Sequence, residues 1–318
     1  MPKRRKRRRV RRRRRNVSNK WMIILAIIVL LLSGLTGYGF ARHRDFMDGI
    51  ISSVTGFFIR SAVVDGEMLV HFIDVGQGDA VLIQTAQGNM LIDGGDNHMG
   101  ERVVAYLRAR GVARLDYVVA THPHADHIGG LIAVLNSIPV NQIIMPNVVH
   151  TTRTFERFID AIEAHNIPVR EPAVGSTITL GDAEFTIIAP NLGLGSGARG
   201  LNDYSVSLRL EFGRTSFIFT GDAETRSENE MLEAGHNLRA DVLHVGHHGS
   251  TTSTTAPFLD AVRPTIAVIN VGADNMYGHP HGAVVRRLEA ARIRIYRTDH
   301  HGNIIITSNG NRLTVTHD

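Results

Sequence analysis

The sequence predicts an α+β fold in which two β-sheets carry helices on their outer faces, preceded by one transmembrane helix. Three observations lead to this prediction. Short runs rich in Val, Ile and Phe recur along the chain, separated by segments with helical spacing. These runs fall into two halves of similar style, as expected for two packed sheets. Near the N-terminus, residues 21–40 instead form a single apolar stretch without one charge.

The N-terminal region combines a basic tail with this apolar stretch. Residues 1–20 contain 13 Lys or Arg and no acidic residue, whereas the rest of the chain has 22 basic against 30 acidic residues. Twenty helical residues at ~1.5 Å each span ~30 Å, the thickness of the hydrocarbon core of a bilayer. Basic flanks stay in the cytoplasm, so we expect a single-pass protein of the cell membrane with a cytoplasmic N-terminus and an extracytoplasmic domain.

Alternatives for this region stay open. The tail could be a nuclear-localisation or nucleic-acid-binding segment, and the apolar stretch could be a buried helix. Residues 39–41 (Gly-Phe-Ala) are a weak match to a signal-peptidase site, and cleavage there would release a secreted domain. The expected organisation is a tail at 1–20, an anchor or signal segment at 21–41, a connector at 42–66 and a folded domain at 67–318.

The folded domain is expected to alternate strands and helices. The first half predicts strands at 67–76, 79–86 and 89–96, a helix at 101–110 and a strand at 115–120. The second half predicts strands at 183–190, 204–212, 214–222, 240–246, 265–272, 292–298, 302–308 and 312–317, with helices at 224–234, 256–262 and 283–291. The Gly-rich segment 190–203 is expected to be a long functional loop.

A dense group of candidate metal ligands follows the strand predicted at 115–120. The sequence THPHADHIGG delivers His122, His124, Asp126 and His127 into one loop. Alternation along this loop can aim the first two histidines at one metal, while Asp126 and His127 turn toward another. The chain has no cysteine, so any metal must be held by His, Asp, Glu or Asn, a set that suits zinc, manganese or iron. The alternative, a polar helix cap, accounts for Asp126 alone.

Further candidate ligands lie at the ends of later strands. Asp222 ends the run FIFTGD, where a carboxylate could bridge two ions, and His247 and His248 follow ADVLHVG. His279 and His281 lie in YGHPHG. Each histidine alone could equally be a hydrogen-bonded loop residue, but together with the first group they indicate a metal site.

The order of these motifs resembles the metallo-β-lactamase superfamily, whose domain is an αββα sandwich with a binuclear metal site at one edge. The fuller set FIDVGQGDAVLI, LIDGGD, THPHADHIGG, NDYSVSL, FTGDAE, VLHVGHHGS and YGHPH resembles the hydrolase domain of the ComEC competence proteins and their free-standing relatives. This similarity covers residues 68–316. It leaves out the N-terminus, and the many-helix channel region of ComEC has no counterpart in this chain.

The resemblance implies two divalent metal ions, zinc or manganese, and a role for each motif residue. His122 and His124 would bind the first ion, Asp126, His127 and His247 the second, Asp222 both, and Asp93 would hold the loop in place. Many family members place a third histidine on the first ion; here LNDYSVSL puts Asn202 or Asp203 near that position. Asp126 would also orient the attacking hydroxide, and His248, His279 or His281 would protonate the leaving oxygen.

The expected function is a membrane-anchored, metal-dependent phosphodiesterase or nuclease acting on DNA outside the cytoplasm. Because the domain outside the tail carries more acidic than basic residues, single-stranded or short DNA, or another phosphodiester, is a more plausible substrate than a long duplex. The alternatives are hydrolysis of another ester, a thioester or a lactam, and a membrane-tethered binding protein with an inactive site. The sequence indicates no protein partner.

Overall fold

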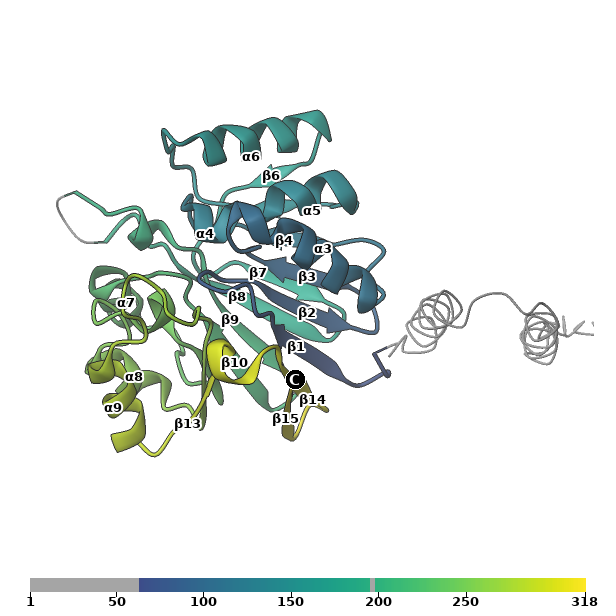
Figure 1. The fold of residues 1–318 in the computed structure, drawn as a ribbon. Helices are drawn as coiled ribbons and strands as arrows, with labels where there is room; N and C mark the ends of the chain where they lie inside the picture. Colours follow the sequence, from purple (N-terminus) through teal and green to yellow (C-terminus); the bar gives the residue numbers. More distant parts are fainter. Residues whose placement is uncertain (1–62, 195–197) are drawn as a thin grey trace, which may run out of the picture. The chain divides into compact units, whose positions relative to one another are not determined.

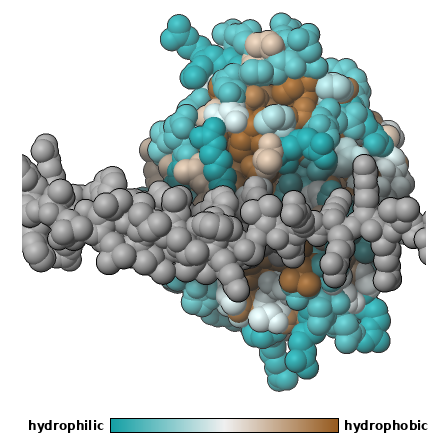
Figure 2. Space-filling model, turned by 90° about the vertical axis from the view of Figure 1, so that its right-hand side faces the viewer, coloured by the Kyte–Doolittle hydropathy of each residue, from teal (hydrophilic) through white to brown (hydrophobic). Residues whose placement is uncertain are grey.

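The computed structural model describes residues 63–194 and 198–318 (Figure 1). The basic tail, the anchor or signal segment and most of the connector therefore lie outside the described residues. Within the part that is described, no helix is long and apolar enough to cross a membrane. The face in Figure 2 is mostly hydrophilic where it is coloured, with hydrophobic groups gathered in limited patches.

Two sheets form the centre of the domain. The eight-stranded sheet has the order β15-β14-β1-β2-β3-β4-β5-β6, and the seven-stranded sheet has the order β13-β12-β11-β10-β9-β8-β7. The first sheet comprises β1 (Met68–Phe72), β2 (Val81–Thr85), β3 (Asn89–Ile92), β4 (Tyr117–Val119), β5 (Ile143–Ile144), β6 (Val169–Arg170), β14 (Ile304–Ser308) and β15 (Leu313–His317). The second comprises β7 (Thr177–Leu180), β8 (Ala183–Ala189), β9 (Ser207–Phe212), β10 (Thr215–Phe219), β11 (Val242–His244), β12 (Ile266–Ile269) and β13 (Arg294–Arg297).

Helices cover the outer face of each sheet (Figure 1). The first sheet is covered by α3 (Gly100–Ala109), α4 (Ala125–Ile128), α5 (Leu131–Ser137) and α6 (Arg153–Ala164), and the second by α7 (Thr225–Glu233), α8 (Ala256–Val262) and α9 (Gly282–Ala290). The short helices are η1 (Asn97–Met99), η2 (Asn202–Tyr204), η3 (Gly246–Gly249) and α10 (Thr298–His301). The expected αββα sandwich is confirmed.

Side-chain alternation along the strands explains these layers. In β2, Val81 and Ile83 belong to the apolar core between the sheets, whereas Leu82 belongs to the core beneath the helices of the first sheet. In β10, Phe217 faces the core between the sheets and Ile218 faces the helices of the second sheet. Both faces of each central strand are therefore buried, as the period of two requires for a four-layer domain.

The parallel strands position the loops that carry the candidate ligands. Strands β3 to β6 are mutually parallel, and so are β10 to β13. The loops at their carboxyl ends therefore emerge at the same edge of each sheet, where α/β folds commonly place their ligands. Asp93, His122, Asp222 and His247 all follow such strand ends.

Two features differ from the division into two halves that the sequence suggested. The C-terminal strands β14 and β15 belong to the first sheet, where β14 pairs with β1 in antiparallel orientation. The segment 138–182, for which no element was predicted, forms α6 and the short strands β5, β6 and β7. The pairing of β14 with β1 is long-range, and local periodicity does not report it, whereas α6 has a local signal because Phe155, Phe158 and Ile162 recur at helical spacing.

Candidate metal centre

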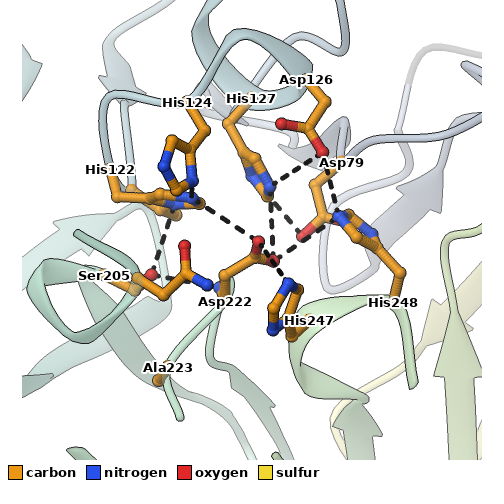
Figure 3. A network of polar contacts seen from close by, with 12 residues as sticks. Asp79, His122, His124, Asp126, His127, Ser205, Asp222, Ala223, His247 and His248 are labelled. Atoms are coloured by element: carbon orange, nitrogen blue, oxygen red, sulfur yellow. Dashed lines mark hydrogen bonds and ion pairs between the residues drawn. The ribbon is translucent and has the colours of Figure 1, made fainter. Parts of the chain in front are cut away.

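The histidine-rich loop joins β4 to α4 and brings three of its imidazoles together. His122 Nε2 lies 3.0 Å from His124 Nδ1, and the rings of His122 and His127 have centroids 4.1 Å apart. His122 and His127 are buried, whereas His124 is partly accessible from a cleft. The loop therefore presents its imidazole nitrogens toward one place, as Figure 3 shows.

Asp222 lies between two groups of these side chains. Its Oδ1 is 3.3 Å from His127 Nε2 and 3.6 Å from His248 Nε2. Its Oδ2 is 3.6 Å from His122 Nε2 and 3.6 Å from His247 Nε2. The two oxygens of one carboxylate thus face two different sets of imidazoles (Figure 3).

The set around Oδ1 has the spacing of ligands around one ion. Asp126 Oδ2 completes it, at 3.8 Å from His127 Nε2 and 3.3 Å from His248 Nε2. Tetrahedral coordination with bonds of about 2.0–2.2 Å places neighbouring ligand atoms about 3.3–3.6 Å apart. Asp126, His127, His248 and Asp222 therefore fit one divalent ion.

This arrangement differs from the expected roles of the two adjacent histidines. His248 was expected to be an acid catalyst and His247 a ligand of the second ion, yet His248 is the buried residue that joins Asp126 and His127. His247 lies on the other side of Asp222, where His122 lies. The backbone of both residues is left-handed, with φ of 50° and 54°, and this local geometry accompanies the placement of the two side chains on opposite sides of Asp222. Such strained non-glycine conformations are uncommon and concentrate at functional sites.

The unpaired atoms of the buried residues test whether a metal fits here. His127 Nε2, His248 Nε2 and Asp222 Oδ1 are buried and have no hydrogen-bond partner. Buried polar atoms without partners are rare in folded proteins, and an ion is one of their ordinary explanations. Three such atoms converge on a single space, so the donor set fits a divalent cation.

Two buried carboxylates support the imidazoles from behind. Asp93 accepts hydrogen bonds from Thr121 N at 2.8 Å, Thr121 Oγ1 at 2.7 Å and His127 Nδ1 at 2.8 Å. This geometry fits the expected role of Asp93 in holding the loop. A carboxylate at Nδ1 fixes the tautomer that leaves Nε2 free to bind metal.

Asp79 is the second supporting carboxylate, and the sequence interpretation gave it no role. It is 2% exposed, and its Oδ1 lies 3.3 Å from His248 Nδ1 and 3.6 Å from His244 Nε2. The available signal was its place in the turn GQGD directly before β2. Asp79 therefore lies behind His248 as Asp93 lies behind His127, although the hydrogen bond of His248 Nδ1 goes to Asn270 O at 3.0 Å.

Glycines allow the three loops of the site to approach closely. A Cβ on Gly78, which precedes Asp79, would lie 2.3 Å from the backbone oxygen of Asp126. A Cβ on Gly130 would lie 1.9 Å from the backbone oxygen of Gly94. Any side chain at these positions would push the GQGD, DGGD and DHIGG turns apart.

The position near the first group, where Asn202 or Asp203 was expected, is not filled by a strong ligand. Asp203 Oδ1 accepts hydrogen bonds from Glu224 N at 3.1 Å and Ser227 N at 3.3 Å, so Asp203 caps the start of α7. Asn202 Nδ2 donates to Glu224 Oε1 at 3.1 Å. Ser205 Oγ lies 3.3 Å from His122 Nδ1 and accepts from Asp222 N at 3.1 Å, so it supports both residues.

The remaining candidates, His279 and His281, have different surroundings. His279 lines the cleft, and its ring centroid is 5.4 Å from that of His247. Burial, together with His247, His248 and His281 nearby, lowers the pKa of His279 to about 4. His281 Nδ1 accepts from Thr251 N at 3.0 Å at the start of α9, which indicates a structural role.

Electrostatics divide the histidines into two kinds. Burial lowers the pKa of His122 well below its ordinary value, which keeps its imidazole neutral. Burial would also lower the pKa of His127 and His248, but the surrounding carboxylates, Asp222 first among them, raise both well above the ordinary value. The pKa of Asp222 is held well below its usual range: burial would raise it, but His127 and His248 outweigh that effect.

A cleft of about 650 Å³ opens onto the centre. Its lining includes His124, Asp126, Asp222, His247 and His279. No Lys or Arg is among the described residues that line it. A substrate can therefore reach the ligand cluster, but the described lining offers it no Lys or Arg side chain.

Comparison with known families identifies this arrangement. The model of the metallo-beta-lactamase superfamily matches residues 73–272, more than half of the chain and all of the ligand set. The chain belongs to the metallo-beta-lactamase superfamily. A metal-dependent hydrolase is the activity that this family and the buried His/Asp cluster indicate.

Curated relatives of this metallo-beta-lactamase chain include competence proteins, which confirms the expected resemblance. It is 31% identical to ComE operon protein 3 of Bacillus subtilis (strain 168) over 274 residues, 80% of this chain and 35% of that protein. It is 34% identical to competence protein ComA of Neisseria gonorrhoeae over 242 residues, 75% of this chain and 32% of that protein. The chain thus spans about a third of the length of these relatives.

Solved structures agree on the fold. The metallo-beta-lactamase fold protein YhfI from Bacillus subtilis superposes with a TM-score of 0.52 and 13% identity, covering 76% of this chain and all of YhfI. CmlA, a diiron beta-hydroxylase from Streptomyces venezuelae, superposes with a TM-score of 0.50 and 16% identity, covering 75% of this chain and 53% of CmlA. At these identities the likeness establishes the fold alone.

Proposed function

We propose that this metallo-beta-lactamase domain is a binuclear metal-dependent phosphodiesterase that cleaves single-stranded or short DNA. The observation that carries the proposal is the position of Asp222, whose two oxygens face two different sets of imidazoles. A carboxylate placed in this way suits two divalent ions that act on one substrate.

The proposed ligand sets follow the distances. Asp126, His127 and His248 would hold one ion, and His122, His124 and His247 the other, with Asp222 shared. His247 then takes the place that a third histidine fills in many family members. Bound divalent ions lower the pKa of water and neutralise charge that develops on a phosphoryl group.

The chain's own residues keep this centre ready for ligands. His127 Nδ1 donates to Asp93 Oδ2 at 2.8 Å, and His248 Nδ1 donates to Asn270 O at 3.0 Å, so both Nε2 atoms face the centre, where each can bind metal once its proton is released. Asp126 lies at the cleft with 29% of its side chain exposed, where it can orient a nucleophile as well as bind metal. The role expected for His279, protonation of the leaving oxygen, stays a prediction. The pKa of His279, lowered to about 4, leaves its imidazole neutral at pH 7, which disfavours that role.

Two further observations support a phosphodiester, and DNA in particular. The curated relatives named competence proteins suggest a setting of DNA uptake. The described lining of the cleft has no Lys or Arg, and histidines that bind metal are neutral, so an anionic substrate depends on bound cations, as phosphodiester cleavage by two metals requires. Other esters, thioesters and lactams remain the competing substrates, whereas an inactive binding protein would not need the full set of converging ligands.

The cellular setting is a separate part of the proposal. The 13 basic residues of the tail and the uncharged stretch 21–40 support a single membrane anchor with the hydrolase domain outside the cytoplasm. Cleavage near residue 41 would give a secreted form of the same domain.

Hydrolysis of an activated phosphodiester tests the proposed function. The purified chain should hydrolyse bis(p-nitrophenyl) phosphate and cleave single-stranded DNA, with manganese a better activator than zinc because the carboxylate-rich set is comparatively hard. Chelator should abolish both activities, and Asp126→Ala should reduce them by about three orders of magnitude or more. His300→Ala is the matched control, since His300 is exposed and lies outside the cleft. Rapid opening of a β-lactam or thioester, with no phosphodiester cleavage under manganese, zinc or magnesium, would contradict the proposal.

A further inference from the structure

The loop between β12 and α9 carries two exposed apolar side chains at the edge of the cleft. Met276 is 89% exposed and Tyr277 is 58% exposed, and both line the cleft that opens onto Asp222. Single exposed apolar residues need no explanation. Two adjacent ones beside a candidate active site, one of them aromatic, provide a surface that a ligand can cover.

The rings of this loop form a continuous series from solvent to the ligand cluster. The Tyr277 ring stacks on His279 with centroids 5.6 Å apart and an interplanar angle of 23°. His279 meets His247 edge-on, with centroids 5.4 Å apart and an angle of 74°. A flat group that covers Tyr277 would therefore lie two rings away from a proposed metal ligand.

Hydrogen bonds hold this loop in one shape although its side chains are exposed. Asn275 Nδ2 donates to Gly272 O at 2.9 Å and to His279 O at 2.6 Å. Asn275 Oδ1 accepts from Tyr277 N at 3.2 Å and from His279 N at 3.0 Å. A loop fastened in this way loses little conformational freedom when a ligand binds, which favours affinity.

The charge of the cleft indicates what kind of contact must supply that affinity. Lys and Arg contacts to phosphates provide most of the binding energy in ordinary DNA-binding sites. Among the described lining residues there is neither, and Asp96, Asp126 and Asp222 are acidic. Contacts with the bases are therefore the clearest additional source of affinity beyond the metal-bound phosphate.

We propose that Tyr277, supported by His279, is a stacking platform for one unpaired base of a single-stranded nucleic acid next to the scissile phosphate. The proposal rests on the phosphodiesterase function proposed above and adds a basis for its substrate choice. The bases of a duplex are stacked on each other and have no free face for Tyr277, whereas a single strand can turn one base onto the ring. Base stacking on an aromatic side chain tolerates any base, so the platform selects strandedness rather than sequence.

The test compares two oligonucleotides that differ only in the base. A labelled oligothymidylate and an abasic oligomer of the same length carry the same phosphates, so contacts of the basic N-terminal tail with phosphate are matched between them. Fluorescence anisotropy is measured with calcium in place of manganese, which keeps divalent cations available to the site, and a gel confirms that the labelled oligomer stays intact. The parent chain should bind the oligothymidylate about tenfold more tightly than the abasic oligomer, since stacking contributes ~1–3 kcal/mol per base.

Variants of the loop then show whether Tyr277 causes the preference for the oligothymidylate over the abasic oligomer. Tyr277→Ala should remove the preference for the intact oligomer, whereas Tyr277→Phe, which keeps the ring, should retain it. Leu192→Ala serves as the control, because Leu192 is 62% exposed but does not line the cleft. An unchanged preference in Tyr277→Ala, or an equal loss of affinity for both oligomers, would overturn the platform.

Steady-state kinetics separate a failure of this proposal from a failure of the proposed function. In the manganese-loaded chain the preference should reappear as a lower KM for the intact oligomer, with a smaller effect on kcat. Cleavage of both oligomers with equal KM would refute the platform and leave the phosphodiesterase intact. Base-dependent binding without phosphodiester cleavage would support the platform and refute the proposed function.

Discussion

His127 Nε2 lies 3.3 Å from Asp222 Oδ1, yet both atoms are buried and neither has a hydrogen-bond partner. Leaving a buried polar atom unpaired costs about 1–3 kcal/mol, so a side-chain pair selected for stability alone would rotate into a hydrogen bond. His127 instead donates its Nδ1–H to Asp93, and its Nε2 faces Asp222 Oδ1, as His248 Nε2 does. The relationship is the one expected for two ligands of a single cation.

The shared carboxylate gives the first prediction. Asp222→Ala should lose more than one equivalent of metal per chain, because Oδ1 and Oδ2 face different imidazole sets. Elemental analysis after dialysis measures the content against the parent and against His300→Ala. Full occupancy in Asp222→Ala would show that Asp222 does not bridge.

The adjacent histidines give the second prediction. His248→Ala and His247→Ala should each lose about one equivalent of metal, because their Nε2 atoms lie on opposite sides of Asp222. The double variant should lose about two. Two equivalents retained in His248→Ala together with a loss of turnover would restore the original expectation that His248 is an acid catalyst and not a ligand.

The third prediction concerns pH. Asp222 and its neighbours raise the pKa of His127 and His248 against the opposing effect of burial, so both imidazoles carry protons near neutral pH in the metal-free protein. Metal must displace these protons, so apparent metal affinity should rise with pH, by up to ~100-fold per unit while two protons are released. Titration with manganese between pH 6 and pH 8 measures this, and a pH-independent affinity would contradict it.

The stability of the metal-free protein should change with pH in the opposite direction. A histidine whose pKa is raised on folding stabilises the folded state below its ordinary pKa of about 6.5, and that contribution is lost as pH rises through the raised pKa. From these two histidines the Tm without metal should therefore fall as pH rises above about 6.5. Added manganese should reverse the fall, because it replaces the protons between the same carboxylates.

The fourth prediction concerns the placement of the domain. Protease added to intact cells should degrade the hydrolase domain and leave the Arg-rich tail protected, because a cluster of 13 basic residues before an apolar stretch stays in the cytoplasm. Immunoblotting with tags at both ends distinguishes the two parts. Degradation of the domain only after cell lysis would contradict an extracytoplasmic position.

Much of the fold and the loop of the first ligands could be predicted because their signals are local. The apolar run along 79–86, the helical spacing along 101–110 and the spacing in HPHADH are properties of neighbouring residues. The pairing of β14 with β1 joins residues more than 200 positions apart, and no local pattern reports it. Helix α6 does have a local signal, since Phe155, Phe158 and Ile162 recur at helical spacing, and the sequence interpretation overlooked it.

Which residue belongs to which ligand set could not be predicted for a similar reason. His247 and His248 are adjacent in the sequence and look like one motif. In the structure both have left-handed backbones, and their side chains lie on opposite sides of Asp222. Asp79 was missed because its contacts with His248 and His244 span more than 160 positions of sequence. The sequence indicates the turn that carries Asp79, but it does not indicate which histidines Asp79 contacts.

The most direct test of the binuclear centre is the anomalous scattering of crystals grown with manganese. A binuclear centre should give two peaks about 3.5–4 Å apart, the usual spacing of paired catalytic ions. One peak should lie among Asp126, His127 and His248, and the other among His122, His124 and His247, with Asp222 contacting both. A single peak, or two peaks of which only one contacts Asp222, would contradict the account.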